Sequence, residues 1–300
     1  MRLGRLVTAT TALGLGTLAY SYVEATRRFV VREVTVPVLP AGHDPIRVLH
    51  LSDIHLVPDQ APKRAWLRSL AALEPDLVVD TGDNLAHPGS VPPLVDDLGP
   101  LLQVPGVFVF GSNDYFAPHR KNPAKYLTGG TGVDREGGWE REKDLPYEHL
   151  RTELSGGGWL DLNNARGELS VRGTRIAFTG VDDPHLRYDE RDPTPARASA
   201  DLRIGVAHAP YLRVLDTFNA AGNELILAGH THGGQLQVPG YGALVTNCDL
   251  DRARANGLHT HRTDGHDRSW LHVSAGCGTS PFTPFRFCCR PEATVLTLTG

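Results

Sequence analysis

The sequence has little of what marks several large classes of protein. Its net charge at pH 7 is only −4, so no broad basic field is present to hold a nucleic acid. It has four cysteines in 300 residues, and none belongs to a Cys-x-x-Cys pair, so the spacing of a zinc ribbon is absent. No internal repeat is visible. A composition that is 40% hydrophobic and 21% charged is typical of a folded globular chain rather than a disordered or fibrous one.

A run without a charge lies near the N-terminus, at residues 6–23. As a helix it would be about 27 Å long, close to the hydrocarbon thickness of a bilayer. We therefore expect residues 1–27 to form a hydrophobic helix that anchors the protein in the cell membrane. A cleaved signal segment, which would give a secreted protein, is the alternative. Arginines flank both ends of the run, so its orientation in the membrane stays open.

The remaining residues, 28–300, are expected to form one domain. Short apolar segments rich in valine, leucine and isoleucine predict strands, and residues 63–73 have the periodicity of a helix. Strands that alternate with helices indicate an α/β fold, in which functional residues gather beyond the carboxyl ends of the strands. The strands are predicted at 28–39, 46–51, 77–79, 107–110, 168–171, 175–179, 203–207, 225–228, 270–274 and 293–298.

Residues 117–143 differ from the rest because they are rich in glycine and charged side chains. They are interpreted as an inserted surface loop or as a cap over a site. A plain solvated excursion is the alternative.

Polar clusters follow the apolar strands and carry the chemistry. They provide two carboxylates, an amide and four imidazoles, with a further carboxylate at Asp114. This mixture of oxygen and nitrogen donors suits borderline divalent metals such as Mn, Fe or Zn. The clusters are Asp53-x-His55, Gly82-Asp83-Asn84, Gly111-Ser112-Asn113-Asp114, Ala207-His208-Ala209-Pro210 and Gly229-His230-Thr231-His232-Gly233-Gly234-Gln235.

The order of these clusters resembles that of the calcineurin-like metallophosphoesterases. The longer run GHTHGGQ and the C-terminal GTSPFTPFRF are similar to the small membrane-anchored bacterial branch of that superfamily. The resemblance covers about residues 28–300. It implies a β-sandwich flanked by helices, in αββα layers, with metals at one edge where loops converge.

The resemblance also implies a role for each matching residue. Asp53, His55 and His232 resemble ligands of a first metal, and His208 and His230 resemble ligands of a second. Asp83 resembles the carboxylate that bridges the two. Two divalent cations held in this way would share a hydroxide that attacks phosphorus in line with the leaving group.

The third cluster departs from the family pattern, which is Gly-Asn-His-Asp. Here Ser112 and Asn113 occupy the two middle positions. We expect Asn113 to bind the second metal, because an amide oxygen is a better neutral ligand than a serine hydroxyl. The usual histidine acid is missing, and Asp114 or His185 is expected to protonate the leaving group instead. Arg286 is expected to form a structural salt bridge, with contact to a substrate phosphate as the alternative.

These observations predict a hydrolase, a metal-dependent phosphoesterase acting on a phosphate mono- or diester or a pyrophosphate. An N-terminal anchor makes a lipid-linked substrate the first hypothesis. A phosphodiesterase for soluble nucleotides and a non-catalytic metal-binding scaffold at the membrane are the alternatives. We expect a monomer that binds no nucleic acid.

Overall fold

The computed structural model describes residues 2–119, 142–190, 194 and 199–300, with the side chains of residues 2–10 left out. Two six-stranded sheets make up the centre of this described part. The first sheet contains, in spatial order, β1 (Val30–Pro37), β14 (Glu292–Thr299), β2 (Ile46–Leu51), β3 (Leu77–Asp80), β4 (Gly106–Phe108) and β5 (Leu160–Asp161). The second contains β12 (Gly257–His261), β13 (Ser269–Val273), β9 (Leu225–Ala228), β8 (Leu202–Val206), β7 (Thr174–Gly180) and β6 (Arg166–Val171).

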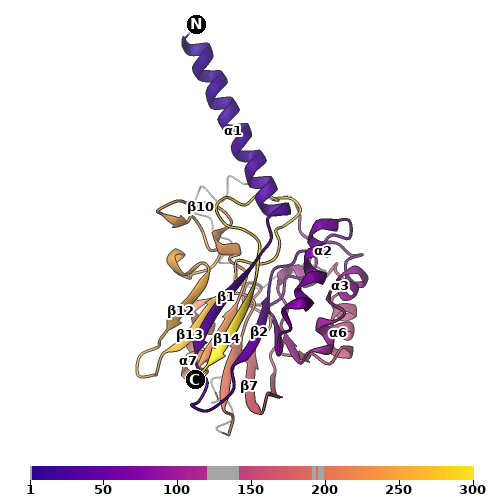
Figure 1. Ribbon diagram of the computed structural model, residues 1–300, viewed down its shortest axis with the longest axis vertical. Helices are drawn as coiled ribbons and strands as arrows, with labels where there is room; N and C mark the ends of the chain where they lie inside the picture. Colours follow the sequence, from indigo (N-terminus) through magenta and orange to yellow (C-terminus); the bar gives the residue numbers. More distant parts are fainter. Residues whose placement is uncertain (1, 120–141, 191–193, 195–198) are drawn as a thin grey trace.

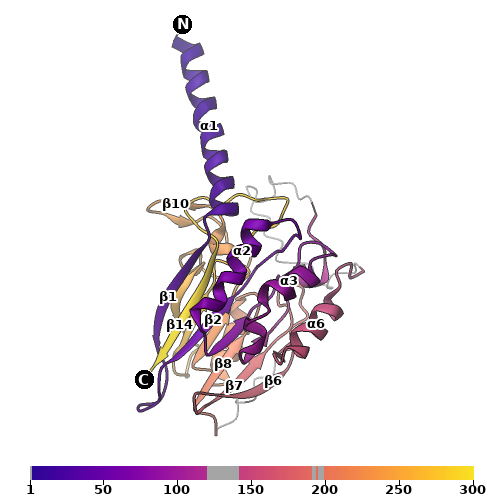
Figure 2. The ribbon, with the colours of Figure 1, turned by 45° about the vertical axis from the view of Figure 1, so that its right-hand side comes forward.

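Helices cover the outer faces of both sheets (Figures 1 and 2). On the first sheet they are α2 (Ala61–Ser69), α3 (Val91–Leu98) and α6 (Tyr147–Gly156), and on the second α7 (Leu212–Ala220). The other elements are α1 (Arg2–Arg27), α4 (Ser112–Tyr115), the hairpin of β10 (Gln237–Val238) and β11 (Gly242–Ala243), and 3₁₀ turns at Leu70–Leu73, Leu101–Gln103, His232–Gly234 and Arg252–Arg254. The predicted α/β sandwich with flanking helices is therefore confirmed.

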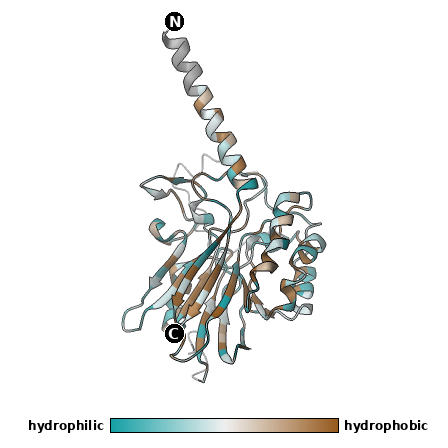
Figure 3. Cartoon of the chain, viewed as in Figure 1, coloured by the Kyte–Doolittle hydropathy of each residue, from teal (hydrophilic) through white to brown (hydrophobic). Residues whose placement is uncertain are grey.

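Alternating side chains explain why the layers form. In β2, Ile46 and Val48 point into the core between the two sheets, whereas Leu49 and Leu51 point toward the helices. Successive residues of a strand face opposite sides, so a strand buried on both faces carries apolar residues in near-continuous runs. Figure 3 shows this as brown colour along the strands of both sheets.

Strand directions determine where the functional loops meet. Strand β1 starts where α1 ends, β14 runs parallel to β1, and β2 runs antiparallel to β14. The carboxyl end of β2, together with those of the parallel strands β3 and β4, therefore lies at the end of the domain from which α1 rises. All the predicted ligands of the first half of the chain follow these strand ends.

Helix α1 projects from this end of the domain, and only its last turns pack against it (Figure 1). Ser21, Glu24 and Ala25 are buried there, whereas Leu13, Leu15 and Leu18 are exposed. Within the described residues, no helix combines the length and the apolarity that crossing a membrane requires. Most of the expected insertion at 117–143, namely residues 120–141, lies outside the described residues.

Candidate metal centre

The predicted ligands lie on loops whose backbone takes a rare conformation. Asp53, His55 and Asp83 have φ angles of 49°, 44° and 58°, and His230 and His232 have φ angles of 69° and 50°. These values lie in the left-handed region, which costs free energy for residues other than glycine and is concentrated at functional sites. Two left-handed residues in each Asp-x-His or His-x-His segment break the alternation of a strand, so both side chains turn toward the same side.

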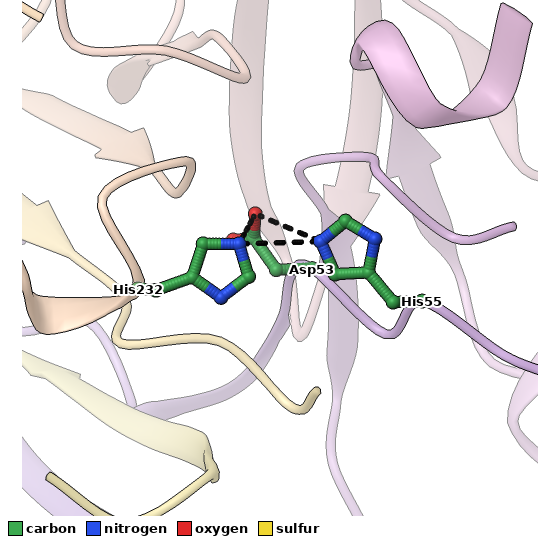
Figure 4. A group of neighbouring side chains, drawn as sticks. All are labelled: Asp53, His55 and His232. Carbon is green, nitrogen blue, oxygen red and sulfur yellow. Dashed lines mark hydrogen bonds and ion pairs between the residues drawn. The ribbon is translucent and has the colours of Figure 1, made fainter. Parts of the chain in front are cut away.

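A first cluster consists of Asp53, His55 and His232 (Figure 4). The Nε2 atoms of His55 and His232 are 3.2 Å apart, and Oδ1 of Asp53 is 3.4 Å from the Nε2 atom of His232. The second oxygen of Asp53 accepts hydrogen bonds from the Ser52 hydroxyl at 2.5 Å and from the backbone N–H of His230 at 2.9 Å. The carboxylate is thereby fixed with Oδ1 facing the two imidazoles.

A second cluster adjoins the first and contains Asp53, Asp83 and His208. The two oxygens of Asp83 face different histidines: Oδ2 is 3.5 Å from Nε2 of His55, and Oδ1 is 3.6 Å from Nε2 of His208. His230 completes this side, with its Nδ1 atom 3.2 Å from Nε2 of His208. Asp83 therefore lies between the two groups of imidazoles.

Backbone carbonyls select which nitrogen faces the centre in three of the four histidines, namely His208, His230 and His232. Nδ1 of His208 donates to the carbonyl of Thr81 at 2.8 Å, and Nδ1 of His232 donates to that of Gly278 at 3.1 Å. In His230 the two nitrogens have exchanged places, since its Nε2 atom lies 3.3 Å from the carbonyl of Asn247. Each contact leaves the opposite nitrogen with a lone pair directed at the cluster, as in histidines that ligate metals.

Glycine is required at two positions beside the ligands. A Cβ atom on Gly111 would lie 2.7 Å from Nε2 of His208, and one on Gly229 would lie 2.6 Å from Oδ2 of Asp53. Neither distance is compatible with van der Waals contact. Gly111 and Gly229 therefore allow the backbone to approach the carboxylates and imidazoles closely.

The charges of the clusters at neutral pH suit a cation. Burial lowers the pKa of His232 to about 4 and holds those of His55 and His230 well below the ordinary value, so these imidazoles are neutral. Burial by itself would raise the pKa of Asp53, but neighbouring His232 and His208 lower it further than burial raises it. Burial also acts to lower the pKa of His208, yet the attraction of Asp83 and Asp53 raises it to about 9. A cation bound here would take the place of that proton.

Two buried polar atoms at the first cluster show that the residues fit a metal. Oδ1 of Asp53 and Nδ1 of His55 have no hydrogen-bond partner among the described residues. A buried carboxylate oxygen without a partner is costly, and only one proton can lie between the Nε2 atoms of His55 and His232, which are 3.2 Å apart. A divalent cation would give Oδ1 of Asp53 a partner and could accept a lone pair from both Nε2 atoms, and the mixed nitrogen and oxygen donors match Mn, Fe or Zn.

The segment Gly111-Ser112-Asn113-Asp114 is placed differently from the other segments that carry predicted ligands. The backbone N–H of Asn113 donates to Oδ1 of Asp83 at 2.7 Å, while its side-chain amide donates to the carbonyl of Phe116 at 2.9 Å. Its predicted role as a metal ligand stays a prediction. Asp114 is fully buried and accepts hydrogen bonds from the backbone N–H groups of Asp83 and Gly111 at 2.8 and 2.9 Å. Asp114 therefore holds two loops together through their backbone N–H groups. Its role as a catalytic acid also stays a prediction.

His185 lies at the second cluster. Its ring centroid is 4.7 Å from that of His230, and its Nδ1 atom is 3.0 Å from the hydroxyl of Tyr211. Its side chain is partly exposed, unlike that of Asp114. Of the two acids considered from the sequence, His185 is thus the one whose side chain solvent can reach beside the predicted ligands.

Two buried cations near the first cluster were not foreseen as supports of the ligands. The ammonium of Lys63 donates to the carbonyls of Ile54 and His55 at 2.7 and 3.2 Å, and burial lowers the pKa of Lys63 to about 7. Arg286 is fully buried, and its Nη2 atom donates to the carbonyls of Ala275 and Gly278 at 2.6 Å each. These partners are backbone carbonyls, which leave no signature in the sequence.

Arg286 corrects an expectation from the sequence. Its complete burial excludes contact with a substrate phosphate in this structure, and its guanidinium is held by backbone carbonyls rather than by a carboxylate in the described residues. The carbonyl of Gly278 receives hydrogen bonds both from Arg286 and from Nδ1 of His232. Arg286 therefore acts on the site by fixing the loop that orients a predicted ligand.

Comparison with known proteins supports the chemistry of this centre. The calcineurin-like phosphoesterase family matches residues 46–234, which contain all of the predicted ligands. The chain is 27% identical over 270 residues to the uncharacterized metallophosphoesterase YkuE of Bacillus subtilis, covering 87% of this chain and 81% of YkuE. It is 26% identical over 260 residues to the phosphodiesterase YaeI of Escherichia coli, covering 85% of this chain and 82% of YaeI.

Among solved structures, the 5'-nucleotidase precursor of Thermus thermophilus aligns with 85% of this chain and 55% of its own, at 14% identity and a TM-score of 0.45. The family match covers most of the chain and spans the strand ends that carry the clusters. The protein therefore belongs to the calcineurin-like phosphoesterase family.

Proposed function

We propose that this protein is a two-metal phosphoesterase that hydrolyses a phosphodiester or a related phosphate ester. The observation that carries the proposal is the position of Asp83, whose two oxygens lie 3.5 and 3.6 Å from imidazole nitrogens of opposite clusters. A carboxylate placed in this way can hold two cations about 3.5–4 Å apart. The relative named as a phosphodiesterase favours a diester as the substrate.

The residues have distinct roles in this proposal. Asp53, His55 and His232 would hold one cation, His208 and His230 the other, and Asp83 both, with Asn113 as a further ligand of the second. When bound, the cations supply an activated water and neutralise charge on the phosphate oxygens. The carbonyls of Thr81, Gly278 and Asn247 keep the histidines in the tautomers that ligation requires.

His185 is the proposed proton donor to the leaving group. It lies beside His230 and contacts the hydroxyl of Tyr211, whereas both oxygens of Asp114 are occupied by backbone N–H groups. A histidine has an ordinary pKa close to neutral pH, which suits it to give a proton at the pH of hydrolysis.

A lipid-linked phosphate at a membrane is the proposed substrate class. Helix α1 rises from the same end of the domain as the metal centre, so attachment of this helix to a bilayer would keep the centre close to lipid headgroups. A cavity of about 430 Å³ lies between α1 and α2, lined by Tyr22, Phe29 and Lys63 among others. Lys63 also donates to the backbone carbonyl of His55, which connects the wall of the cavity to the loop that carries this predicted ligand.

The test uses the full chain with added Mn²⁺ and the soluble diester bis(4-nitrophenyl) phosphate. The parent protein is expected to release 4-nitrophenol, and Asp83→Asn to lose turnover by more than about 100-fold, because the bridge between the clusters is weakened. Asp264→Asn, in an exposed turn, is the matched control and should retain activity. Metal binding without turnover of any phosphate ester would instead favour the scaffold hypothesis.

A second assay separates the substrate classes. A lipid pyrophosphate in vesicles and a soluble cyclic nucleotide would be offered to the same preparation. Faster hydrolysis of the lipid supports the membrane hypothesis, whereas a preference for the nucleotide supports the soluble phosphodiesterase.

A further inference from the structure

The exposed apolar side chains are gathered at one end of the molecule. In the described part of the chain, every exposed large apolar side chain except Val31 lies on α1, on or next to the β10–β11 hairpin, or in the loop before Arg286. We name the members that encircle the base of α1 the apolar rim. The apolar rim consists of Tyr20, Tyr22, Leu236, Val238, Tyr241, Leu244, Phe282 and Phe285.

Contacts between side chains and between backbone groups join the three segments of the apolar rim into one surface. The rings of Tyr22 and Phe285 lie 6.4 Å apart, which links α1 to the loop. The backbone N–H of Gln237 in β10 donates to the carbonyl of Phe287 at 2.9 Å, which links the hairpin to the same loop. Figure 1 shows β10 and this loop beside the base of α1. The rim is therefore continuous across residues more than 200 positions apart in sequence.

The two loops of the rim carry no exposed charge. Residues 236–248 contain no charged side chain, and residues 275–288 contain only the buried Arg286. Cations stand at the edge instead: Arg252 lies over the ring of Tyr241 at 5.1 Å, and Arg27 and Arg28 are exposed at the base of α1. Aromatic rings with a border of arginines are typical of surfaces at the level of lipid headgroups.

Helix α1 is consistent with a bilayer at this end of the molecule. It contains several threonines, and a Cβ atom added at Gly14 or Gly16 would meet nothing within 4 Å, so neither helix propensity nor packing against the domain stabilises the stretch from Leu13 to Leu18 in water. In an apolar medium every backbone group must bond within the segment, and a helix satisfies this requirement. A helix of this composition is thus consistent with a lipid environment.

We propose that the apolar rim is a membrane-contact surface, separate from α1 in sequence, which seats the end of the domain against a lipid bilayer. Tyr241, Val238 and Phe282 would enter the boundary between headgroups and acyl chains while Arg252 faces the headgroups. The metal centre lies at this same end, because the strands that carry it finish there. The proposal does not depend on hydrolysis.

A local probe of depth tests the proposal on the full chain. Tyr241→Trp and Phe282→Trp would each be mixed with vesicles of phosphatidylethanolamine and phosphatidylglycerol that contain brominated lipid. Indole fluorescence above the parent signal is expected to shift to the blue and to be quenched. Ala41→Trp, in the exposed turn after β1 at the opposite end of the domain, is the matched control and should be unaffected. Equal quenching at Ala41, or none at either rim position, would overturn the proposal.

A partition experiment tests whether the rim contributes to binding. The triple variant Val238→Ser/Tyr241→Ser/Phe282→Ser should bind the same vesicles at least about 10-fold more weakly, since each side chain loses apolar area that lipid would bury. Ala41→Ser, at the opposite end of the domain, should bind like the parent, and Asp83→Asn should bind normally even if it is inactive. A dimer in sedimentation that the triple variant abolishes, with vesicle binding unchanged, would assign the rim to a second copy of the chain instead.

Discussion

His55 faces His232 where the strands end, and His50 faces His272 within the sheets. The Nε2 atoms of the first pair are 3.2 Å apart, and the Nδ1 atoms of the second are 2.9 Å apart. The first pair adjoins Asp53, whereas Nε2 of His50 is within hydrogen-bond distance of the Thr81 hydroxyl, at 3.0 Å. Two histidine pairs with similar separations between their nitrogens, one stacked and one edge-on, therefore have different chemistry.

The backbone accounts for the difference. His55 and His232 have positive φ angles and lie on loops beside carboxylates, whereas His50 and His272 lie in β2 and β13. A histidine in a strand can be satisfied by neighbouring strands and by the facing sheet, so its burial needs no cation. Left-handed backbone conformation and an unpartnered carboxylate oxygen distinguish the pair that suits a metal.

The largest effect is expected when one histidine of each pair is replaced, because the first replacement should change metal affinity and the second should change stability. His232→Asn should weaken Mn²⁺ binding by at least about 100-fold, because it removes a predicted ligand, while the metal-free protein keeps its stability. His272→Asn should leave Mn²⁺ affinity nearly unchanged and lower the free energy of unfolding by about 1–3 kcal/mol, because His50 loses its partner. Calorimetric titration and urea unfolding measure the two quantities. A large loss of metal affinity in His272→Asn would contradict the assignment of His50 and His272 as a pair that binds no metal.

His185 is expected to matter according to the leaving group. His185→Asn should slow a diester with an alkoxide leaving group by about 100-fold, because an assisting proton is lost. The loss of rate with a 4-nitrophenolate leaving group should be far smaller, since that anion needs no proton. The ratio of kcat/KM for the two esters is the measurement, with Tyr211→Phe as the control that keeps the imidazole. Equal slowing of both esters would rule out the acid role.

Arg286 provides a test of indirect support for His232. Arg286→Lys should raise the Mn²⁺ concentration needed for half-maximal turnover by about 10–100-fold, because a single ammonium cannot hold the carbonyls of Ala275 and Gly278 together. At saturating Mn²⁺ the rate should recover, which a general loss of fold would not allow. Arg290→Lys, four residues further along the chain, is the control. A fall in kcat that added metal does not restore would contradict a positioning role.

The smallest effect is expected from pH. Burial lowers the pKa of His50 to about 3, below the ordinary 6.5 of an unfolded histidine. Between these values the unfolded state binds more protons, so the free energy of unfolding decreases as the pH falls below about 6.5. The slope for one such group approaches about 1.4 kcal/mol per pH unit.

Urea unfolding of the metal-free parent and of His50→Gln from pH 7 to pH 4 measures the His50 contribution as the difference between the two slopes. The comparison is needed because burial raises the pKa values of Asp80 and Asp183, which act in the opposite direction. Equal slopes in the two proteins would contradict the neutral, buried state of His50.

Much of the fold was predictable because its strands are buried on both faces. The strand at Ile46–Leu51 has the predicted bounds, and the helix expected at 63–73 appears as α2 and the 3₁₀ turn that follows it. The β10–β11 hairpin was not predicted, because its strands have two residues each and its turn contains proline and glycine. Such short elements depend on the loops they pack against.

The predicted ligands could be identified because each follows an apolar strand, and the structure brings five of them within the two clusters. Their supports could not be identified in the same way. The backbone N–H of Arg286 donates to the carbonyl of Ser21, a residue far from it in sequence. The side chains of Lys63 and Arg286 donate to backbone carbonyls. The predicted boundary after residue 27 stays a prediction, although Ser21 and Glu24 are already buried against the domain.

The most direct test of the two-metal centre is X-ray diffraction from crystals of the Mn²⁺-loaded protein at wavelengths on both sides of the manganese absorption edge. We expect two anomalous peaks about 3.5–4 Å apart. One should lie among Asp53, His55 and His232, the other at His208 and His230, with Asp83 between them. A single peak, or peaks away from Asp83, would rule out a two-metal centre at these residues.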